Sequence, residues 1–234
     1  MQKLIVANWK MYGSKTMAEA FLKTFLYSKT DTYNYIFCPP FTLLASFEKF
    51  LNSQKYILGA QNCSSFENGA FTGDISAEML KEFNCSYCLI GHSERRQIYH
   101  EDDEKILTTK IQQLLKHQIT PIFCVGESLE DKKQGTAFQK IKHQLNVLKE
   151  INNEIIIAYE PIWAIGTNKV PNIQEINEMH QFIKNLYLKP LKVLYGGSVN
   201  PQNAADILTS DQVDGILVGR ASLEVASLLA LKER

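Results

Sequence analysis

The sequence lacks an excess of charge of either sign. Its 234 residues contain 25 Lys and Arg and 25 Asp and Glu, so the formal net charge is zero. Proteins that bind the phosphate backbone of nucleic acids generally carry an overall positive field. We therefore do not expect nucleic acid as a partner.

Long apolar runs are also missing. No stretch approaches the roughly 18 consecutive apolar residues of a membrane-spanning helix. The first residues, MQKLIVANWK, have neither the long apolar segment nor the small-residue cleavage site of a secretory signal. We expect a soluble, cytoplasmic protein with no membrane partner.

Cysteines are few and odd in number. The five of them are scattered along the chain, which favours reduced thiols over a disulfide framework. Cys85 and Cys88 form a C-x-x-C pair at the start of an apolar run, where a spacing of three places side chains on opposite faces of a strand. A zinc site needs two further ligands that the sequence does not offer, so we predict no metal.

The sequence does contain eight short apolar runs, each followed by a turn and a stretch of helical periodicity. These runs are 4–7, 35–38, 57–60, 87–91, 120–125, 155–159, 192–195 and 215–218. Amphipathic segments between them include 104–117, 136–148 and 173–188. Apolar strands separated by helices predict a parallel sheet covered by those helices. Eight units of about 29 residues predict an α/β fold with a single (β/α)8 TIM barrel, one domain spanning 1–234.

The competing architecture is an open, doubly wound sheet that binds a dinucleotide. Its glycine-rich fingerprint should follow the first strand, but here that run is followed by Asn8, Trp9 and Lys10. No linker, low-complexity tract or run of charge divides the chain. We therefore favour the closed barrel and predict no cofactor.

Polar residues and glycines follow five of the eight runs, at the strand ends where barrels of this kind carry their reactive groups. They are Asn8 and Lys10; His92, Ser93 and Glu94; Glu160; Gly196, Gly197 and Ser198; and Gly219, Arg220, Ala221 and Ser222. Glycines after the seventh and eighth runs leave backbone N–H groups free beside a helix N-terminus. The last two segments therefore predict a phosphate-sized anion site.

Glu160 is the candidate base of this site. Pro161 follows it and gives the loop a stiff start, because its φ is fixed. Lys10 adds a positive charge and His92 a donor for an oxygen, so the parts needed to abstract a proton next to a carbonyl are present. Taken singly, each residue has a simpler interpretation: Glu160 as a helix cap or salt-bridge partner, Lys10 as a solvated surface charge, and His92 as a semi-buried histidine. Their convergence on one rim favours catalysis on a small phosphorylated carbonyl compound.

Six motifs, in order along essentially the whole chain, resemble the triosephosphate isomerase family. They are ANWKM at 7–11, GAFTG at 69–73, IGHSERR at 90–96, AYEPIWAIGT at 158–167, YGGSV at 195–199 and VDGILVG at 213–219. The resemblance implies an aldose–ketose isomerase that interconverts dihydroxyacetone phosphate and D-glyceraldehyde 3-phosphate. It would serve glycolysis and gluconeogenesis without a cofactor.

The resemblance also implies a role for each site residue. Glu160 would carry the proton between the two carbons through an enediol(ate), while His92 polarises the oxygens. Lys10 would be the cation at the substrate, Asn8 a neighbouring polar contact, and Glu94 the carboxylate that positions Lys10. The phosphate would be bound by Gly166, Ser198 and Gly219.

Two loops take their expected roles from the same resemblance. Residues 161–169 resemble a mobile lid that closes over the reactive intermediate and excludes water. The loop 61–73 carries Phe66 and Phe71, aromatics that a solvated loop rarely exposes together. They either fold back on the barrel or, as in the family, dock into a second subunit, where Thr72 reaches the other active site. We predict a homodimer.

Two residues depart from the family pattern. Arg220 replaces a second glycine, and its backbone N–H can still serve the phosphate if the local φ suits a residue with a Cβ. The Arg220 guanidinium would either point at the phosphate or turn to solvent. The sequence alone favours the solvent-facing orientation. Pro171 replaces an alanine whose amide binds the tyrosine of YGGSV when the lid closes, and proline has no amide hydrogen to offer Tyr195. The lid is therefore expected to close with one tether fewer.

Two other functions could be built on the same barrel. An aldolase, or a synthase acting on phosphorylated precursors, needs a Schiff-base lysine on a central strand or a second substrate pocket, whereas Lys10 lies at the rim. An inactive barrel that serves as a scaffold or phosphosugar sensor would have no need of Glu160, His92 and Lys10 together. Isomerisation remains the favoured function.

Overall fold

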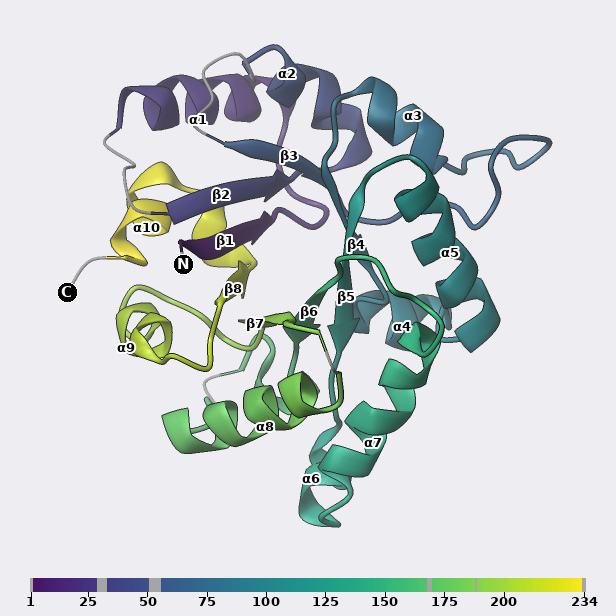
Figure 1. Ribbon diagram of the computed structural model, residues 1–234. Coiled ribbons are helices and arrows are strands. Elements are labelled where there is room, and N and C mark those ends of the chain that lie inside the picture. The colour runs from purple at the N-terminus through teal and green to yellow at the C-terminus, as the bar shows by residue number, and fades with distance from the viewer. Residues whose placement is uncertain (1, 29–32, 51–55, 168–169, 188, 233–234) are drawn as a thin grey trace.

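The computed structural model describes residues 2–28, 33–50, 56–167, 170–187 and 189–232. Within these residues the strands form a closed barrel in which β1 to β8 pair in sequence order and β8 closes on β1, all in parallel (Figure 1). The strands are β1 (Lys3–Asn8), β2 (Tyr33–Cys38), β3 (Ile57–Ala60), β4 (Tyr87–Ile90), β5 (Thr120–Val125), β6 (Ile156–Tyr159), β7 (Lys192–Tyr195) and β8 (Gly215–Val218). The predicted fold class is confirmed, with strand limits within two residues of the predicted runs.

Helices surround the barrel on the outside (Figure 1). They are α1 (Lys15–Tyr27), α2 (Leu44–Glu48), α3 (Ala77–Glu82), α4 (Ser93–Tyr99), α5 (Glu104–Lys116), α6 (Leu129–Lys133), α7 (Ala137–Gln144), α8 (Ile173–Asn185), α9 (Ala204–Thr209) and α10 (Val225–Ala230). The predicted helix 136–148 is shorter than expected: its last four residues form the 3-10 helix η3 (Leu145–Leu148). Asn146 and Val147 are poor helix formers, and a helix end tightens readily into 3-10 geometry. The predicted helix 173–188 ends at Asn185, and residue 188 lies outside the described residues.

Two apolar layers hold the barrel together. Side chains alternate along each strand, so Leu4 and Val6 fill the barrel interior while Ile5 and Ala7 pack toward the helices. Strands buried on both faces require the uninterrupted apolar runs seen in the sequence. The layered packing fixes the carboxyl ends of the strands, on which the site is built.

The cysteines correct one expectation. All five are buried and carry free thiols. Cys85 precedes β4 and Cys88 lies within it, and both pack into the outer apolar layer instead of onto opposite faces. Strand alternation does not apply to Cys85, because the strand begins only at Tyr87. Among the described helices, none is long and apolar enough to cross a membrane.

A fully buried histidine in α8 makes the stability depend on pH. His180 Nδ1 lies 3.2 Å from the carbonyl oxygen of Gln212, and its ring packs edge-on against Tyr159. Burial lowers the pKa of His180 from 6.5 to about 4. On acidification, His180 is therefore protonated near pH 6.5 in the unfolded chain but only near pH 4 in the folded chain. The stability that neutral His180 gives the folded state is fully present above pH 6.5 and is lost as the pH falls toward 4.

We expect the wild-type protein to lose about 2 kcal/mol of unfolding free energy through His180 between about pH 7.5 and pH 5.0. His180→Asn keeps a donor for the Gln212 carbonyl and removes the titrating group, so this part of the pH dependence should disappear. Urea denaturation of both proteins at the two pH values measures the difference. Equal pH losses in the two proteins would contradict the assignment.

Candidate active site

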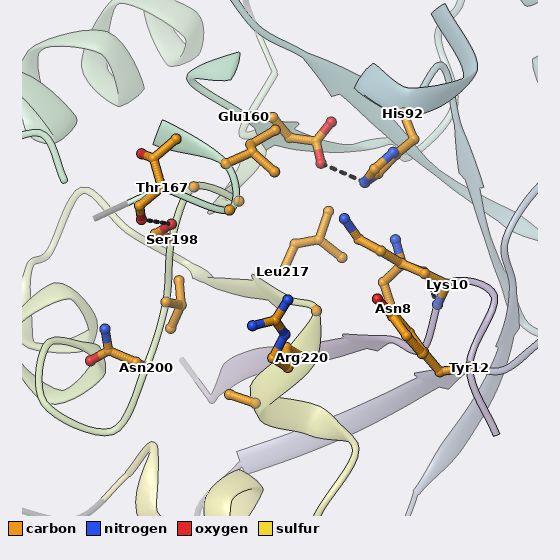
Figure 2. A pocket seen from close by; sticks show the side chains of 17 residues that line it. Asn8, Lys10, Tyr12, His92, Glu160, Thr167, Ser198, Asn200, Leu217 and Arg220 are labelled. Atoms are coloured by element: carbon orange, nitrogen blue, oxygen red, sulfur yellow. Dashed lines mark hydrogen bonds and ion pairs between the residues drawn. The ribbon is translucent and has the colours of Figure 1, made fainter. Parts of the chain in front are cut away.

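The carboxyl ends of the strands surround a cavity of about 300 Å³ (Figure 2). The predicted site residues that line it are Asn8, Lys10, His92, Glu160, Gly166, Ser198, Gly219 and Arg220. Glu94 reaches the site indirectly, through Lys10. Thr72 is exposed on the loop after β3 and does not line this cavity. Residues at the carboxyl ends of five strands, β1, β4, β6, β7 and β8, thus line one cavity.

Lys10 is held in a strained conformation directly after β1. Its φ is +53°, a left-handed value that a side chain disfavours by roughly 1–2 kcal/mol. The Asn8 side chain accepts a hydrogen bond from the Lys10 amide at 3.0 Å, and Gln61 donates to the Lys10 carbonyl at 2.9 Å. Lys10 Nζ lies 2.6 Å from Glu94 Oε1. The strained backbone and this ion pair together fix the ammonium group at the cavity.

His92 caps the N-terminus of α4 and faces Glu160. The Glu94 amide donates to His92 Nδ1 at 3.2 Å, so the ring proton is assigned to Nε2. Nε2 lies 3.0 Å from Glu160 Oε1, the contact drawn in Figure 2. Burial opposes protonation of His92, but attraction to Glu160 and then Glu94 outweighs it and raises the pKa of the ring.

Glu160 is a buried carboxylate held at two oxygens. Besides His92 at Oε1, the Ser93 amide donates to Oε2 at 3.1 Å. Burial alone would raise the pKa of Glu160, but His92, the Ser93 amide and the charge of Lys10 together lower it below its ordinary value. The carboxylate is therefore ionised and able to accept a proton once it leaves these partners.

Glycines after β7 are required by close packing. A Cβ on Gly196 would lie 2.9 Å from Glu160 Cγ, and one on Gly197 would lie 2.2 Å from the Tyr195 hydroxyl. Ser198 Oγ lies 2.5 Å from the carbonyl oxygen of Ala164 and 2.9 Å from that of Thr167, so these two acceptors share its one hydroxyl proton. The YGGS segment therefore lies directly against both Glu160 and the predicted lid.

The predicted lid begins with the 3-10 helix η4 (Ile162–Ala164). Trp163 Nε1 donates to Glu127 Oε1 at 2.7 Å, and Lys132 Nζ lies 3.9 Å from the centre of the indole ring. Gly166 has a φ of +65°, which suits a glycine at the tip of a loop. Asn168 and Lys169, also part of the predicted lid, lie outside the described residues.

Sequence reasoning missed Glu127, Gln61 and Arg96. Glu127 is buried and accepts hydrogen bonds from Trp163 and the Tyr159 hydroxyl. Arg96 donates to the carbonyls of Gly91 and Cys124, which ties the start of α4 to the barrel. Glu127 follows β5 by two residues, so the rule applied to the other strand ends would have found it. Gln61 and Arg96 bind backbone oxygens and leave no comparable signal in the sequence.

The Tyr195 hydroxyl is buried, and within the described residues it has no hydrogen-bond partner. Burial raises the pKa of this phenol. Pro171 is also buried and, as a proline, carries no amide hydrogen. No group of three or more His, Cys, Asp or Glu side chains in the described part of the chain could hold a metal ion.

Comparison with known proteins identifies the family. The model of the triosephosphate isomerase family matches residues 3–234. The triosephosphate isomerases of Aquifex aeolicus and Alkaliphilus metalliredigens are each 42% identical to this chain, with 97% and 99% of both sequences covered. The crystal structure of triosephosphate isomerase from Bartonella henselae superposes with a TM-score of 0.89 at 34% identity, covering 99% of this chain and 98% of its own. With its closed barrel and its rim of converging side chains, this chain belongs to the triosephosphate isomerase family and is an isomerase.

Proposed function

We propose that the chain interconverts dihydroxyacetone phosphate and D-glyceraldehyde 3-phosphate through an enediol(ate) intermediate, with Glu160 as the base. The 3.0 Å contact between Glu160 Oε1 and His92 Nε2 inside the cavity carries the proposal. It pairs an ionised carboxylate with a ring N–H, and these are the two groups that proton transfer next to a carbonyl requires.

The contact also defines the first step. Glu160 and His92 satisfy each other in the present arrangement, so a substrate carbonyl at His92 has to displace the carboxylate. Leaving the N–H donors of Ser93 and His92 makes Glu160 more basic, because the donors stabilise its charged form. Glu160 then removes a proton from one carbon and returns it to the next, while His92 donates to the oxygens. Lys10 stabilises the negative charge that develops on the intermediate.

The glycine-rich end of the cavity is the proposed phosphate site. Gly166, Ser198 and Gly219 would bind the phosphate chiefly through backbone N–H groups, while Asn8 would contact the substrate beside Lys10. Closure of 161–169 over the bound substrate would exclude water from the intermediate. The hydrogen bonds from Ser198 Oγ to Ala164 and Thr167 support a direct coupling of this site to the lid.

A coupled isomerase assay on both triose phosphates tests the proposal. We expect turnover in each direction without added metal or cofactor. Absence of turnover with fully folded protein would overturn it. We further propose that 1–234 acts as one domain in the cytoplasm and serves glycolysis and gluconeogenesis. The pairing of β1 to β8 into one closed barrel supports the domain assignment.

We also propose a homodimer, built on the loop between β3 and α3. In Figure 1 this loop projects beyond α3, away from the barrel. It carries Phe66 and Phe71, which stack on each other with ring centres 3.8 Å apart and remain 49% and 40% exposed. Such an exposed aromatic pair favours burial against a second chain. In that assembly Thr72 would reach the partner's active site.

Replacing both Phe66 and Phe71 with serine should convert the dimer to a monomer at micromolar concentration and lower the specific activity. Sedimentation velocity and the isomerase assay measure the two effects. Tyr27→Ser, at a 92% exposed aromatic on the end of α1, is the control and should change neither. A wild-type protein that sediments as a fully active monomer would refute the dimer.

A further inference from the structure

Arg220 is the residue at the phosphate end that sets this chain apart, and its backbone position is rigid. It begins the 3-10 helix η5 (Arg220–Ser222) directly after Gly219. The fully buried Ser222 donates to the Gly219 carbonyl through both its amide, at 2.9 Å, and its hydroxyl, at 2.7 Å. Arg220 is not among the residues with positive φ, so its Cβ is accepted without backbone strain.

The Arg220 side chain lines the cavity. Figure 2 shows it across the cavity from Glu160, between Asn200 and Asn8. The residue is also exposed. Its guanidinium therefore remains hydrated at the rim while lying within reach of an anion that enters the cavity.

The charged side chains around the cavity carry a net negative charge when Arg220 is left out. Glu94 neutralises Lys10 at 2.6 Å, and Glu160 is ionised. Without Arg220 these three groups sum to one negative charge, which repels a phosphate dianion. Within the described residues, no carboxylate oxygen lies within the 4.0 Å ion-pair distance of the Arg220 guanidinium, so its charge is uncompensated.

We propose that Arg220 makes this active site selective for the charge of the phosphate group. Its guanidinium binds the phosphate oxygens and offsets the carboxylates, where the remaining phosphate contacts are neutral backbone and hydroxyl groups. The inference rests on the proposed function, since it assumes that the phosphate of the substrate occupies this end of the cavity.

The test compares Arg220→Gln with wild type on D-glyceraldehyde 3-phosphate and on unphosphorylated D-glyceraldehyde. For the phosphorylated substrate we expect KM to rise about tenfold and kcat to change less than about twofold. For the unphosphorylated substrate kcat/KM should stay the same. Arg220→Lys, which keeps the charge but loses the planar fork, should recover part of the loss. Lys142→Gln, the same change of charge at an exposed lysine of α7, should alter neither KM nor kcat.

An unchanged KM in Arg220→Gln would overturn the inference, and so would an equal loss on both substrates, because that would indicate a structural role. Calorimetric titration with inorganic phosphate at low salt separates this inference from the proposed function. About tenfold weaker phosphate binding by Arg220→Gln supports the role of Arg220 even in a protein that fails to isomerise trioses. Equal phosphate binding by the two proteins refutes it even in an active enzyme.

Discussion

Replacing Glu160 with glutamine should lower kcat about a thousandfold or more and change KM by less than about threefold. The amide has nearly the same shape as the carboxylate but cannot accept a proton from carbon. The phosphate contacts and His92 remain, so the substrate should still bind. Steady-state kinetics in the coupled assay measure both constants.

Glu160→Asp separates the presence of the carboxylate from its position. The side chain is shorter by one methylene, and withdrawing a base by about 1 Å costs roughly a hundredfold in rate. Glu150→Gln removes an exposed carboxylate from another part of the chain and should leave kcat unchanged. Full activity in either Glu160 variant would overturn the assignment of the base.

The barrel was predictable because its signal is repeated eight times. The central residues of each strand are apolar, as burial on both faces requires. Because barrels of this kind carry their reactive groups at the carboxyl ends of the strands, Glu160, His92 and Lys10 could then be predicted to lie on one rim. The low helix propensity of Asn146 and Val147 does not by itself predict that α7 ends at Gln144. Gln144, the last residue of α7, also exchanges two hydrogen bonds with the backbone of Gly126, a tertiary contact that periodicity does not reveal.

The conformation and hydrogen bonding of the site residues could not be predicted from the sequence either. The sequence placed Glu160 and His92 on one rim but could not show that they bind each other when no substrate is present. Nor could it show the positive φ of Lys10, since that depends on Asn8 and Gln61 holding its backbone. Both features arise from contacts between segments far apart in the chain. The sequence pattern therefore predicts where the site lies, whereas these long-range contacts determine the conformation and hydrogen bonding of its residues.

Gly126, which follows β5, lies against the backbone of Glu160. A Cβ placed on it would be 1.8 Å from the Glu160 carbonyl oxygen and 2.8 Å from the carbonyl carbon. Neither backbone can move easily. The Glu160 amide donates to the Val125 carbonyl at 2.7 Å, and Gln144 binds the amide and the carbonyl of Gly126 at 2.9 and 3.0 Å.

Gly126→Ala should therefore lower the unfolding free energy by about 3 kcal/mol or more and reduce kcat at least about tenfold, because β5 and β6 must separate and carry Glu160 with them. Gly135→Ala is the matched control. Gly135 has a φ of +71° with nothing within 4 Å of an added Cβ, so this change should cost only the roughly 1–2 kcal/mol of left-handed backbone and leave kcat intact. Urea denaturation at one protein concentration, together with the isomerase assay, measures both effects. If Gly126→Ala were as stable and as active as the control, the backbone of β5 and β6 would have to move apart locally at little cost. The hydrogen bonds of Gly126 and Glu160 would then hold the backbone of Glu160 less rigidly than we infer.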